Sequence, residues 1–150
     1  MRSVCVVVGS RANYSSIKSA MRAIQAHSEL ELQLVVGASA LLDRYGTVLE
    51  VIEQDGFEPD ERVFMLIEGE TPSTMAKSTG LGLLELPTAF ERLRPDIVIT
   101  VGDRFETMAT ALAAKKPGTG IPAARIDEVV GRAARSAIAA DTVVTEEMLA

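Results

Sequence analysis

Three short runs rich in apolar residues constrain the fold of this chain more than any other feature. They cover 4–8, 31–36 and 97–101, each stops at a glycine, and a helical pattern follows each of them. Runs of this kind fill the interior of parallel sheets, whose strands are buried on both faces. Because strands that alternate with helices require right-handed crossovers, the pattern predicts an α/β fold with a Rossmann-like parallel sheet. The last of the three runs has the pattern of the most clearly buried strand.

Helical periodicity and helix-end signals set the other expected elements. Helical patterns cover 17–24, 41–52, 72–94, 106–114 and 125–130, and a weaker strand pattern covers 62–67. Pro72 suits the first position of its helix, with Thr71 as the N-cap. Pro87 removes a backbone donor inside that helix, so we expect a break or kink near it.

The composition changes after Ala114, and this change sets the expected domain boundary. Residues 115–122 read Lys-Lys-Pro-Gly-Thr-Gly-Ile-Pro, a turn-rich stretch that cannot continue a helix. The net charge of −6 falls on residues 1–114, because residues 115–150 hold equal numbers of acidic and basic residues. We therefore expect a Rossmann-like unit over 1–114 and a short irregular α+β tail over 115–150.

Composition also argues against several classes of function. A length of 150 residues suits one globular domain, and the acidic charge disfavours a nucleic-acid partner. No run is long enough to span a membrane and no leader pattern is present, so a cytoplasmic protein without a membrane partner is expected. Cys5, the only cysteine, lies inside an apolar run, which favours a buried structural thiol. One cysteine and one histidine argue against a metal site.

Two polar clusters follow the first and the last strand, at the position where ligands of open α/β sheets bind. The first is Gly9, Ser10, Arg11, Ala12, Asn13 and Tyr14, and the second is Gly102, Asp103, Arg104, Phe105 and Glu106. A helix N-terminus beside Arg11 offers amide dipoles and a guanidinium group to an anion, which favours a phosphorylated or nucleotide-linked ligand. A second interpretation stays open, in which Arg11 and Asp103 cap helices and pair with neighbouring side chains.

Neither cluster matches a common nucleotide-binding motif. Residues 9–14 lack the Gly-x-Gly-x-x-Gly pattern, and the second strand ends in Val36 and Gly37 rather than in an acidic residue. The chain also lacks the Gly-x-x-x-x-Gly-Lys pattern of P-loops. A nicotinamide dinucleotide is therefore disfavoured, and we expect no cofactor.

Five segments of the first 114 residues resemble one known family in the same order. They are 4–14, 30–36, 52–57, 75–83 and 94–104. These segments resemble the N-terminal part of UDP-N-acetylglucosamine 2-epimerases, and most of all the hydrolysing branch of sialic acid biosynthesis. The resemblance implies a glycosyltransferase-B-type enzyme of two Rossmann-like domains with the sugar nucleotide between them, of which this chain holds a truncated N-terminal half.

The resemblance also implies a reaction and roles for the two clusters. UDP is eliminated from UDP-N-acetylglucosamine to give a 2-acetamidoglucal, and water then adds to yield N-acetylmannosamine. By motif, Asp103 is the catalytic or orienting carboxylate and Arg11 faces the diphosphate, while Arg104 and Glu106 support the loop. The substrate-binding candidates are Gly9, Ser10, Arg11, Asn13, Tyr14, Gly102, Arg104 and Glu106. The expected partners are UDP-N-acetylglucosamine or UDP and further copies of the chain, as a homo-oligomer or by self-association.

The tail resembles a different enzyme. Residues 116–122, 126–131 and 141–149 resemble the end of the antifreeze-like (SAF) domain of sialic acid synthases, which act next in the same pathway. By this resemblance the chain lacks the second epimerase domain. Three hypotheses follow: an epimerase-family enzyme that is incomplete as this chain, a non-catalytic sugar-nucleotide-binding or assembly module, and an inactive fusion remnant of the two enzymes.

Overall fold

A computed structural model describes residues 1–46, 48–115, 129–137 and 145–150 of the chain. It has two compact units, Met1–Ala114 and Lys115–Ala150. The larger unit contains four parallel strands: β1 Arg2–Val8, β2 Leu30–Gly37, β3 Glu61–Val63 and β4 Ile97–Thr100. Their order, β3-β2-β1-β4, is that of the first four strands of a Rossmann-like sheet. The predicted α/β fold with a parallel sheet is confirmed.

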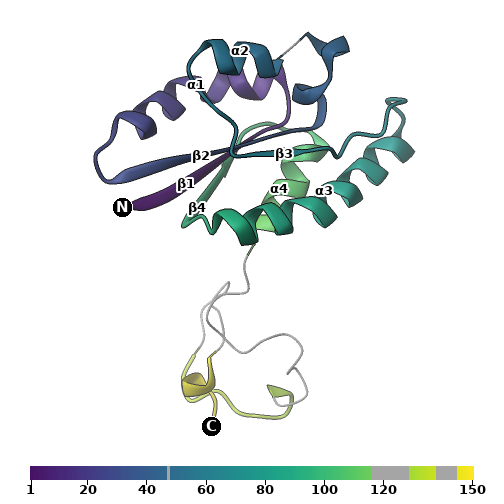
Figure 1. The fold of residues 1–150 in the computed structure, drawn as a ribbon. Coiled ribbons are helices and arrows are strands. Elements are labelled where there is room, and N and C mark those ends of the chain that lie inside the picture. The colour runs from purple at the N-terminus through teal and green to yellow at the C-terminus, as the bar shows by residue number, and fades with distance from the viewer. Residues whose placement is uncertain (47, 116–128, 138–144) are drawn as a thin grey trace. The chain divides into compact units, whose positions relative to one another are not determined.

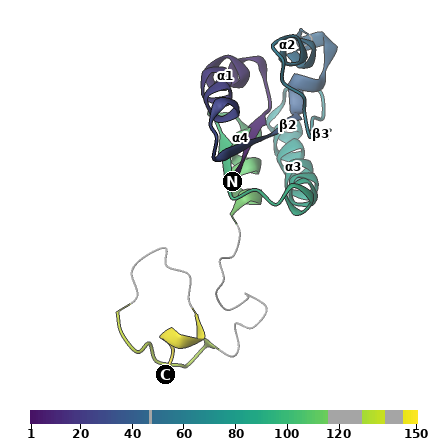
Figure 2. The same cartoon turned by 60° about the vertical axis from the view of Figure 1, so that its left-hand side comes forward.

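Helices cover both faces of this sheet (Figure 1). The four α-helices are α1 Arg11–Ala26, α2 Val48–Gln54, α3 Pro72–Leu93 and α4 Phe105–Ala114. α1 and α2 lie on one face, whereas α3 and α4 pack against each other on the opposite face (Figure 2). The unit is therefore a three-layer sandwich in which each strand except the shortest leads directly or through a short loop into a helical segment.

β1 is buried on both of its faces, as the first apolar run predicts. Val6 and Val8 belong to the core beneath α1 and α2. Cys5 and Val7 belong to the core beneath α3 and α4, because successive side chains of a strand point to opposite faces. Burial raises the pKa of the Cys5 thiol to about 12, with a smaller contribution from Asp60. At neutral pH the thiol is enclosed and protonated, so the prediction of a structural cysteine is confirmed.

The helix expected over 41–52 is wrong in its first half. Two 3-10 turns, Ala38–Leu41 and Asp43–Tyr45, occupy this region, and α2 begins only at Val48. Gly46 closes the second turn in the left-handed region, with φ of +88°. A right-handed helix cannot continue through such a residue, so the apolar residues on either side of it belong to separate elements.

The strand expected over 62–67 is wrong in its length, since β3 ends at Val63. Val63 pairs with Gly37, the last residue of β2. The next residue, Ala38, turns away from the sheet with φ of +49°. The residues that follow Val63 therefore have no strand residues of β2 with which to pair. Phe64, the first of them, is 72% exposed.

α3 continues as one helix through Pro87, so a break does not occur there, and the alternative of a kink stays a prediction. Its start is as predicted, with Thr71 as the N-cap, Pro72 in the first turn and a capping box between Thr71 and Thr74. Pro87 cannot donate a hydrogen bond to the carbonyl of Leu83. Leu83 lies at the exposed side of the helix, where solvent can hydrogen-bond that carbonyl instead.

β4 lies at the edge of the sheet that the described residues form, contrary to the prediction that it is a clearly buried strand. Among the described residues it pairs with β1 alone, and the side chain of Ile97 is 42% exposed. An apolar run indicates that a strand is present, but the number of strands beside it depends on the rest of the sheet.

The smaller unit contains little regular structure in its described residues. Ala134 and Leu149 form an isolated antiparallel bridge, and a 3-10 turn covers Glu146–Met148. The helix expected over 125–130 lies mostly outside the described residues. Across the described part of the whole chain, no helix has both the length and the apolar character needed to cross a membrane.

Two glycines of α3 should respond in opposite ways to substitution by alanine. A Cβ atom on Gly82 would lie 2.5 Å from Met65 Cε and 2.9 Å from Ala109 Cβ. A Cβ atom on Gly80 would meet nothing within 4 Å. We expect Gly80→Ala to raise the free energy of unfolding by about 0.5–1 kcal/mol through helix propensity. Gly82→Ala should lower it by about 1 kcal/mol or more, because α4 must move away.

Urea unfolding of both variants beside the parent chain measures these changes. The two substitutions are matched, since they differ only in what the added methyl group meets. A stabilised Gly82→Ala variant would contradict the close packing of α3 on α4.

Candidate functional site

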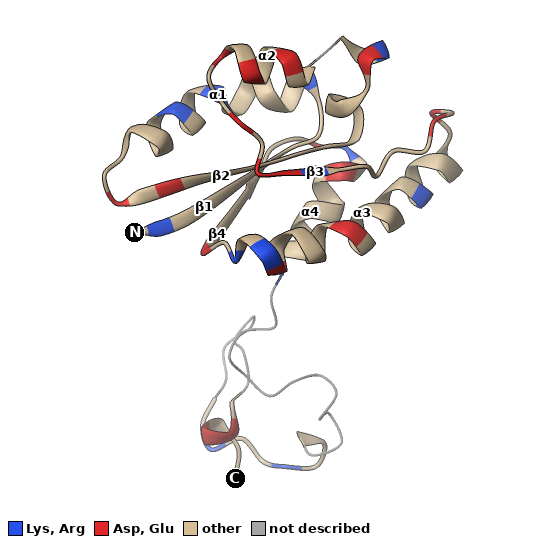
Figure 3. Ribbon diagram, in the orientation of Figure 1, with Lys and Arg blue, Asp and Glu red and all other residues tan. Residues whose placement is uncertain are grey.

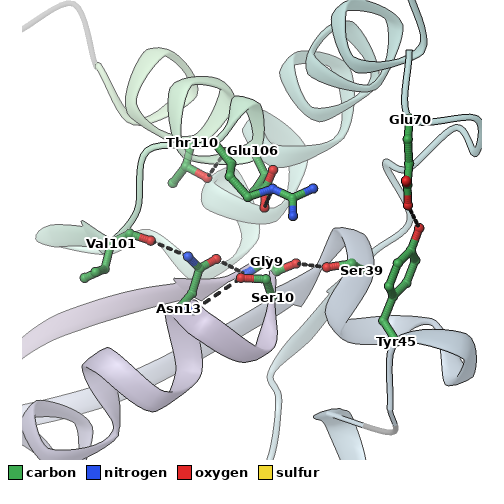
Figure 4. Close-up of polar contacts among 10 residues, drawn as sticks. Gly9, Ser10, Asn13, Ser39, Tyr45, Glu70, Val101, Glu106 and Thr110 are labelled. Atoms are coloured by element: carbon green, nitrogen blue, oxygen red, sulfur yellow. Dashed lines mark hydrogen bonds and ion pairs between the residues drawn. The ribbon is translucent and has the colours of Figure 1, made fainter. Parts of the chain in front are cut away.

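The pairing of β1 with β4 brings the two predicted clusters to the same edge of the sheet. Val7 lies opposite Thr100 in the register, so the chain leaves the two strands side by side. Asn13 connects the loops that follow β1 and β4. Its Oδ1 accepts a hydrogen bond from the Gly9 N–H at 3.1 Å. Its Nδ2 donates to the Val101 carbonyl at 2.6 Å (Figure 4). Asn13 is thus a buried cross-link between the two loops.

Gly9 and Gly102 are both required by this packing. A Cβ atom on Gly9 would lie 2.7 Å from Cγ of Glu106, and one on Gly102 would lie 2.7 Å from Nδ2 of Asn13. Gly102 also has φ of +131°, a region that favours glycine. These two predicted substrate-binding residues therefore have a structural reason to be glycine that is independent of any ligand.

Ser10 and Arg11 form the beginning of α1. Ser10 is the N-cap, and its Oγ accepts a hydrogen bond from the Asn13 N–H at 3.2 Å. Arg11 is exposed, and its Nη2 donates to the Gly46 carbonyl at 2.9 Å. A helix N-terminus carries a partial positive charge and Arg11 adds a full one beside it, so this corner of the molecule suits an anion.

Tyr14 belongs to the core rather than to the exposed part of the first cluster. Its hydroxyl group donates to Oδ2 of Asp55 at 2.7 Å, and its ring meets Phe57 edge to face at 6.4 Å. Burial, followed by the hydrogen bond to Asp55, raises the pKa of Tyr14. Hydrogen bonds from Lys18 and Tyr14 lower the pKa of Asp55. The hydroxyl of Tyr14 is therefore already used within the protein.

Asp103 and Arg104 lie exposed in the loop between β4 and α4. Within the described part of the chain, the Asp103 carboxylate makes no hydrogen bond and no ion pair. Nε of Arg104 lies 3.2 Å from Oε1 of Glu106, and the guanidinium carbon lies 5.7 Å from the centre of the Phe105 ring. An unpaired carboxylate beside a guanidinium group is free to orient a ligand or to exchange a proton with it.

Glu106 is only 4% exposed, in contrast to its two neighbours in the cluster. Arg104 is near enough for an ion pair, but neither carboxylate oxygen of Glu106 has an aligned hydrogen-bond donor. Oγ1 of the adjacent Thr107 is also buried without a partner. Hydrogen-bonding capacity in the first turn of α4 is therefore unused within the described residues.

A cavity of about 260 Å³ opens at the same edge of the sheet. Its walls include Ser39 after β2, Leu66 after β3 and Arg104 after β4, together with the first turns of α3. Ser39 Oγ donates to the Gly9 carbonyl at 3.0 Å, which ties this wall to the loop after β1 (Figure 4). All four strands thus direct their carboxyl ends toward one small region, as expected for an open α/β sheet.

Sequence reasoning missed Tyr45 and Glu70, which lie at the rim of the cavity. The Tyr45 hydroxyl donates to Oε1 of Glu70 at 2.8 Å (Figure 4). Arg44 donates to the same hydroxyl at 2.7 Å and pairs with Glu68 at 2.9 Å. No local pattern predicts this contact between segments 25 residues apart. Ser39, by contrast, follows a predicted strand and could have been found by the rule that found the two clusters.

Charges of opposite sign border this edge of the sheet. Arg11 and Arg104 follow β1 and β4, whereas the loop before α3 is acidic, and its Glu68 and Glu70 lie near Arg44 (Figure 3). Among the described residues, no three His, Cys, Asp or Glu side chains are grouped so as to hold a metal ion. The arrangement suits an anionic ligand bound by arginine side chains and helix amides, with the Asp103 carboxylate beside it.

A family model described as UDP-N-acetylglucosamine 2-epimerase matches residues 22–124. The chain belongs to this family. A second model, described as the SAF domain, matches residues 108–150. The predicted resemblance of the first part to the epimerases is confirmed, and the end of this epimerase-family chain matches the SAF domain.

Two relatives of this epimerase-family chain are named as hydrolysing epimerases. The GDP/UDP-N,N'-diacetylbacillosamine 2-epimerase of Campylobacter jejuni is 28% identical over 110 residues, which are 73% of this chain and 28% of that protein. The UDP-N,N'-diacetylbacillosamine 2-epimerase of Legionella pneumophila is 30% identical over 114 residues, 76% of this chain and 30% of that protein. The chain therefore spans less than a third of the length of these relatives.

Solved structures of the epimerase family share the fold. A crystal structure of a UDP-N-acetylglucosamine 2-epimerase matches with a TM-score of 0.65 and 25% identity, over 75% of this chain and 30% of that chain. The Neisseria meningitidis enzyme, bound to UDP-GlcNAc, matches with a TM-score of 0.61 and 20% identity, over 75% of this chain and 29% of that chain. The second likeness concerns the fold alone.

The cross-link made by Asn13 should be a large contribution to stability. We expect Asn13→Ala to lower the free energy of unfolding by about 2–4 kcal/mol, because it leaves the Gly9 N–H and the Val101 carbonyl without their partner. Ser16→Ala is the matched control on the same helix, since Ser16 Oγ bonds only the Ala12 carbonyl on the exposed face. Its effect should stay within about 0.5 kcal/mol. If Asn13→Ala and Ser16→Ala lower the free energy of unfolding in urea by equal amounts, Asn13 is not a cross-link.

The contacts of Asp55 with Lys18 and with Tyr14 should make stability depend on pH. The pKa of Asp55 is lowered from its usual 3.8 in the folded chain. The ionised carboxylate therefore contributes stability above that value, and the contribution is lost as the pH falls through the folded pKa. Asp55→Asn should be less stable than the parent near neutral pH, and the difference should shrink below about pH 4.

Urea unfolding of Asp55→Asn near neutral pH and at about pH 3 checks this dependence. Asp43→Asn, which removes an exposed carboxylate from a 3-10 turn, should follow the parent at both pH values. A constant difference between Asp55→Asn and the parent would refute the assignment of the pH dependence to this carboxylate.

Proposed function

We propose that this chain forms one wall of a nucleotide-sugar site and takes part in the hydrolysing 2-epimerisation of a UDP-linked 2-acetamido sugar. The observation that carries the proposal is the carboxylate of Asp103, which has no partner within the described residues and lies at the sheet edge that also bears Arg104 and the N-terminus of α1 with Arg11. A diphosphate leaving group and a carbon acid need these two kinds of group close together.

The proposed reaction has two steps. In the first, a proton leaves C2 of the sugar and the bond between C1 and the oxygen of UDP breaks, which gives a 2-acetamidoglucal. In the second, water adds across the new double bond, with the hydroxyl group on C1 and the proton on the opposite face of C2. UDP-N-acetylglucosamine and water thus become N-acetylmannosamine and UDP.

In this proposal, different residues of the chain bind the diphosphate, act on the sugar and stabilise the site. Arg11 and the amides of the α1 N-terminus neutralise charge on the departing diphosphate. Asp103 is the acid, base or orienting group at the sugar, since it is exposed and has no partner among the described residues. Asn13 and Tyr14 hold the wall together through their hydrogen bonds and do not contact the ligand.

A single wall does not orient a sugar for elimination. The chain spans less than a third of the Campylobacter and Legionella relatives. Because proximity and orientation supply a large part of enzymatic rate enhancement, we propose that the chain alone binds the diphosphate weakly and turns over substrate only with a second wall. A second candidate function is a nucleotide-sugar-binding module without turnover, which is supported by Arg11 and the α1 N-terminus, since these groups can bind a diphosphate without chemistry.

UDP is the part of the ligand for which this wall has the best-placed groups. The names of the two relatives both include UDP-N,N'-diacetylbacillosamine, with GDP as an alternative in the Campylobacter name, and the meningococcal structure holds UDP-GlcNAc. These compounds share UDP and an acetamido group but differ elsewhere in the sugar. We therefore propose a UDP-linked 2-acetamido sugar as the substrate class, and the predicted homo-oligomer stays a prediction.

Calorimetric titration with UDP tests the binding half of the proposal. We expect Arg11→Ala to weaken UDP binding by about tenfold or more, because a charge-assisted hydrogen bond to phosphate is lost. Arg22→Ala is the matched control on the same helix, where Arg22 lies 3.6 Å from Asp55, and it should leave UDP binding unchanged. A parent chain that does not bind UDP would refute the proposal.

Turnover is tested by mixing the chain with the remaining part of the Legionella relative and following release of UDP from each UDP-linked sugar. Asp103→Asn should keep UDP affinity and lose product formation. Release of UDP by Asp103→Asn at the parent rate would remove Asp103 from the mechanism. Binding without any turnover in the mixture would favour the module without catalysis.

A further inference from the structure

The buried carboxylate of Glu106 has a position that packing alone does not explain. It is 4% exposed, and neither oxygen accepts a hydrogen bond within the described residues. Burying an ionised carboxylate without donors is costly. An acidic residue in the first turn of α4 is favoured by the helix dipole, but an exposed side chain serves that purpose without the cost of burial. The burial therefore indicates that the carboxylate acts on a neighbour.

The side chain of Glu106 packs closely against the end of β1. It lies against the bare backbone of Gly9, where an added Cβ atom would be 2.7 Å from Cγ of Glu106. The backbone of Glu106 is held as well, since its carbonyl accepts a hydrogen bond from Oγ1 of Thr110 at 2.9 Å (Figure 4). The carboxylate is thus enclosed at the edge of the sheet.

The neighbour on which it acts is Arg104. Nε of Arg104 lies 3.2 Å from Oε1 of Glu106, although 54% of the arginine side chain is exposed. The ion pair engages the inner side of the guanidinium group. The two terminal nitrogens make no hydrogen bond within the described residues, and Arg104 forms part of the wall of the 260 Å³ cavity. The terminal nitrogens are therefore available donors beside Asp103.

We propose that Glu106 is a positioning residue that holds Arg104 in the orientation in which its terminal nitrogens bind the diphosphate of a nucleotide ligand. The inference rests on the proposed function, which makes this edge of the sheet a diphosphate site. An arginine side chain loses conformational freedom when it binds an anion, and one that is already held loses less. Glu106 thereby raises affinity without contacting the ligand.

A double-mutant cycle with UDP as the ligand tests the proposal on the full chain. Glu106→Gln keeps the size of the side chain but removes its charge, and we expect the dissociation constant for UDP to rise roughly three- to tenfold. In the Arg104→Met background, the same substitution should have no further effect. Glu85→Gln removes an equal charge from an exposed position of α3 and should leave UDP affinity unchanged.

Unchanged or tighter binding of UDP by Glu106→Gln overturns the proposal. An effect that persists in the Arg104→Met background also overturns it, because Glu106 then acts independently of Arg104. Thermal unfolding separates positioning from loss of structure: we expect a midpoint for Glu106→Gln no lower than that of the parent, since a buried carboxylate without hydrogen bonds is removed. If Glu106→Gln lowers the unfolding midpoint and reduces UDP affinity equally in the parent and Arg104→Met backgrounds, Glu106 has a structural role and the proposal is overturned.

A measurement without ligand distinguishes this inference from the proposed function. In an NMR spectrum of arginine side chains, the Nε–H signal of Arg104 is identified by its absence from Arg104→Met. In the parent chain, the chemical shift of this Arg104 signal should differ from those of freely moving arginines. In Glu106→Gln it should move to the same position as theirs. If UDP does not bind to the parent, the proposed function fails. If Glu106→Gln leaves the Arg104 signal unchanged, the contact between Arg104 and Glu106 is refuted whether or not UDP binds.

Discussion

The hydrogen bonds of one buried side chain, Asn13, hold together the edge of the sheet on which the candidate site depends. They join the exits of β1 and β4, and the Nδ2 bond connects residues 88 apart in the sequence. Gly102 must lack a side chain because the amide group of Asn13 approaches it, and Gly9 must lack one because Glu106 packs against it. The parallel pairing of β1 with β4 brings the loops near each other, and Asn13 sets their spacing. An exposed carboxylate and two arginines then share one edge.

Neighbouring residues in each cluster have different roles because helix and loop geometry direct them differently. Arg11 and Tyr14 lie three positions apart in α1, yet Arg11 is exposed while Tyr14 is buried against Phe57. The same division occurs before α4, where Asp103 is exposed and Glu106 is enclosed. A cluster that is continuous in sequence therefore contains groups that can contact a ligand and groups that hold the wall in shape.

The strands and the two clusters were predictable because their signals are local. An apolar run with a terminal glycine identified β1, β2 and β4, and the cap at Thr71 identified the start of α3. The errors arose where the backbone conformation of one residue, its exposure to solvent or a distant contact decides the outcome. Gly46 divides an apolar pattern that reads as one helix, Pro87 is tolerated where Leu83 is exposed to solvent, and β4 is exposed because of its place in the sheet. The contact of Tyr45 with Glu70 belongs to the same class.

The amino-acid sequence by itself determined the α/β class, the family, and the set of residues from which a site at the ends of β1 and β4 could be built. Hydrophobic periodicity and glycine positions are properties of short segments, so they are readable without a structure. Only the tertiary structure decided which candidates are free and which are used. Asp103 is exposed and has no partner among the residues that the structure describes, Tyr14 is bound to Asp55, and Glu106 is buried against Gly9 beside Arg104. The reason is that burial and pairing of a side chain depend on backbone segments that lie far away in the sequence.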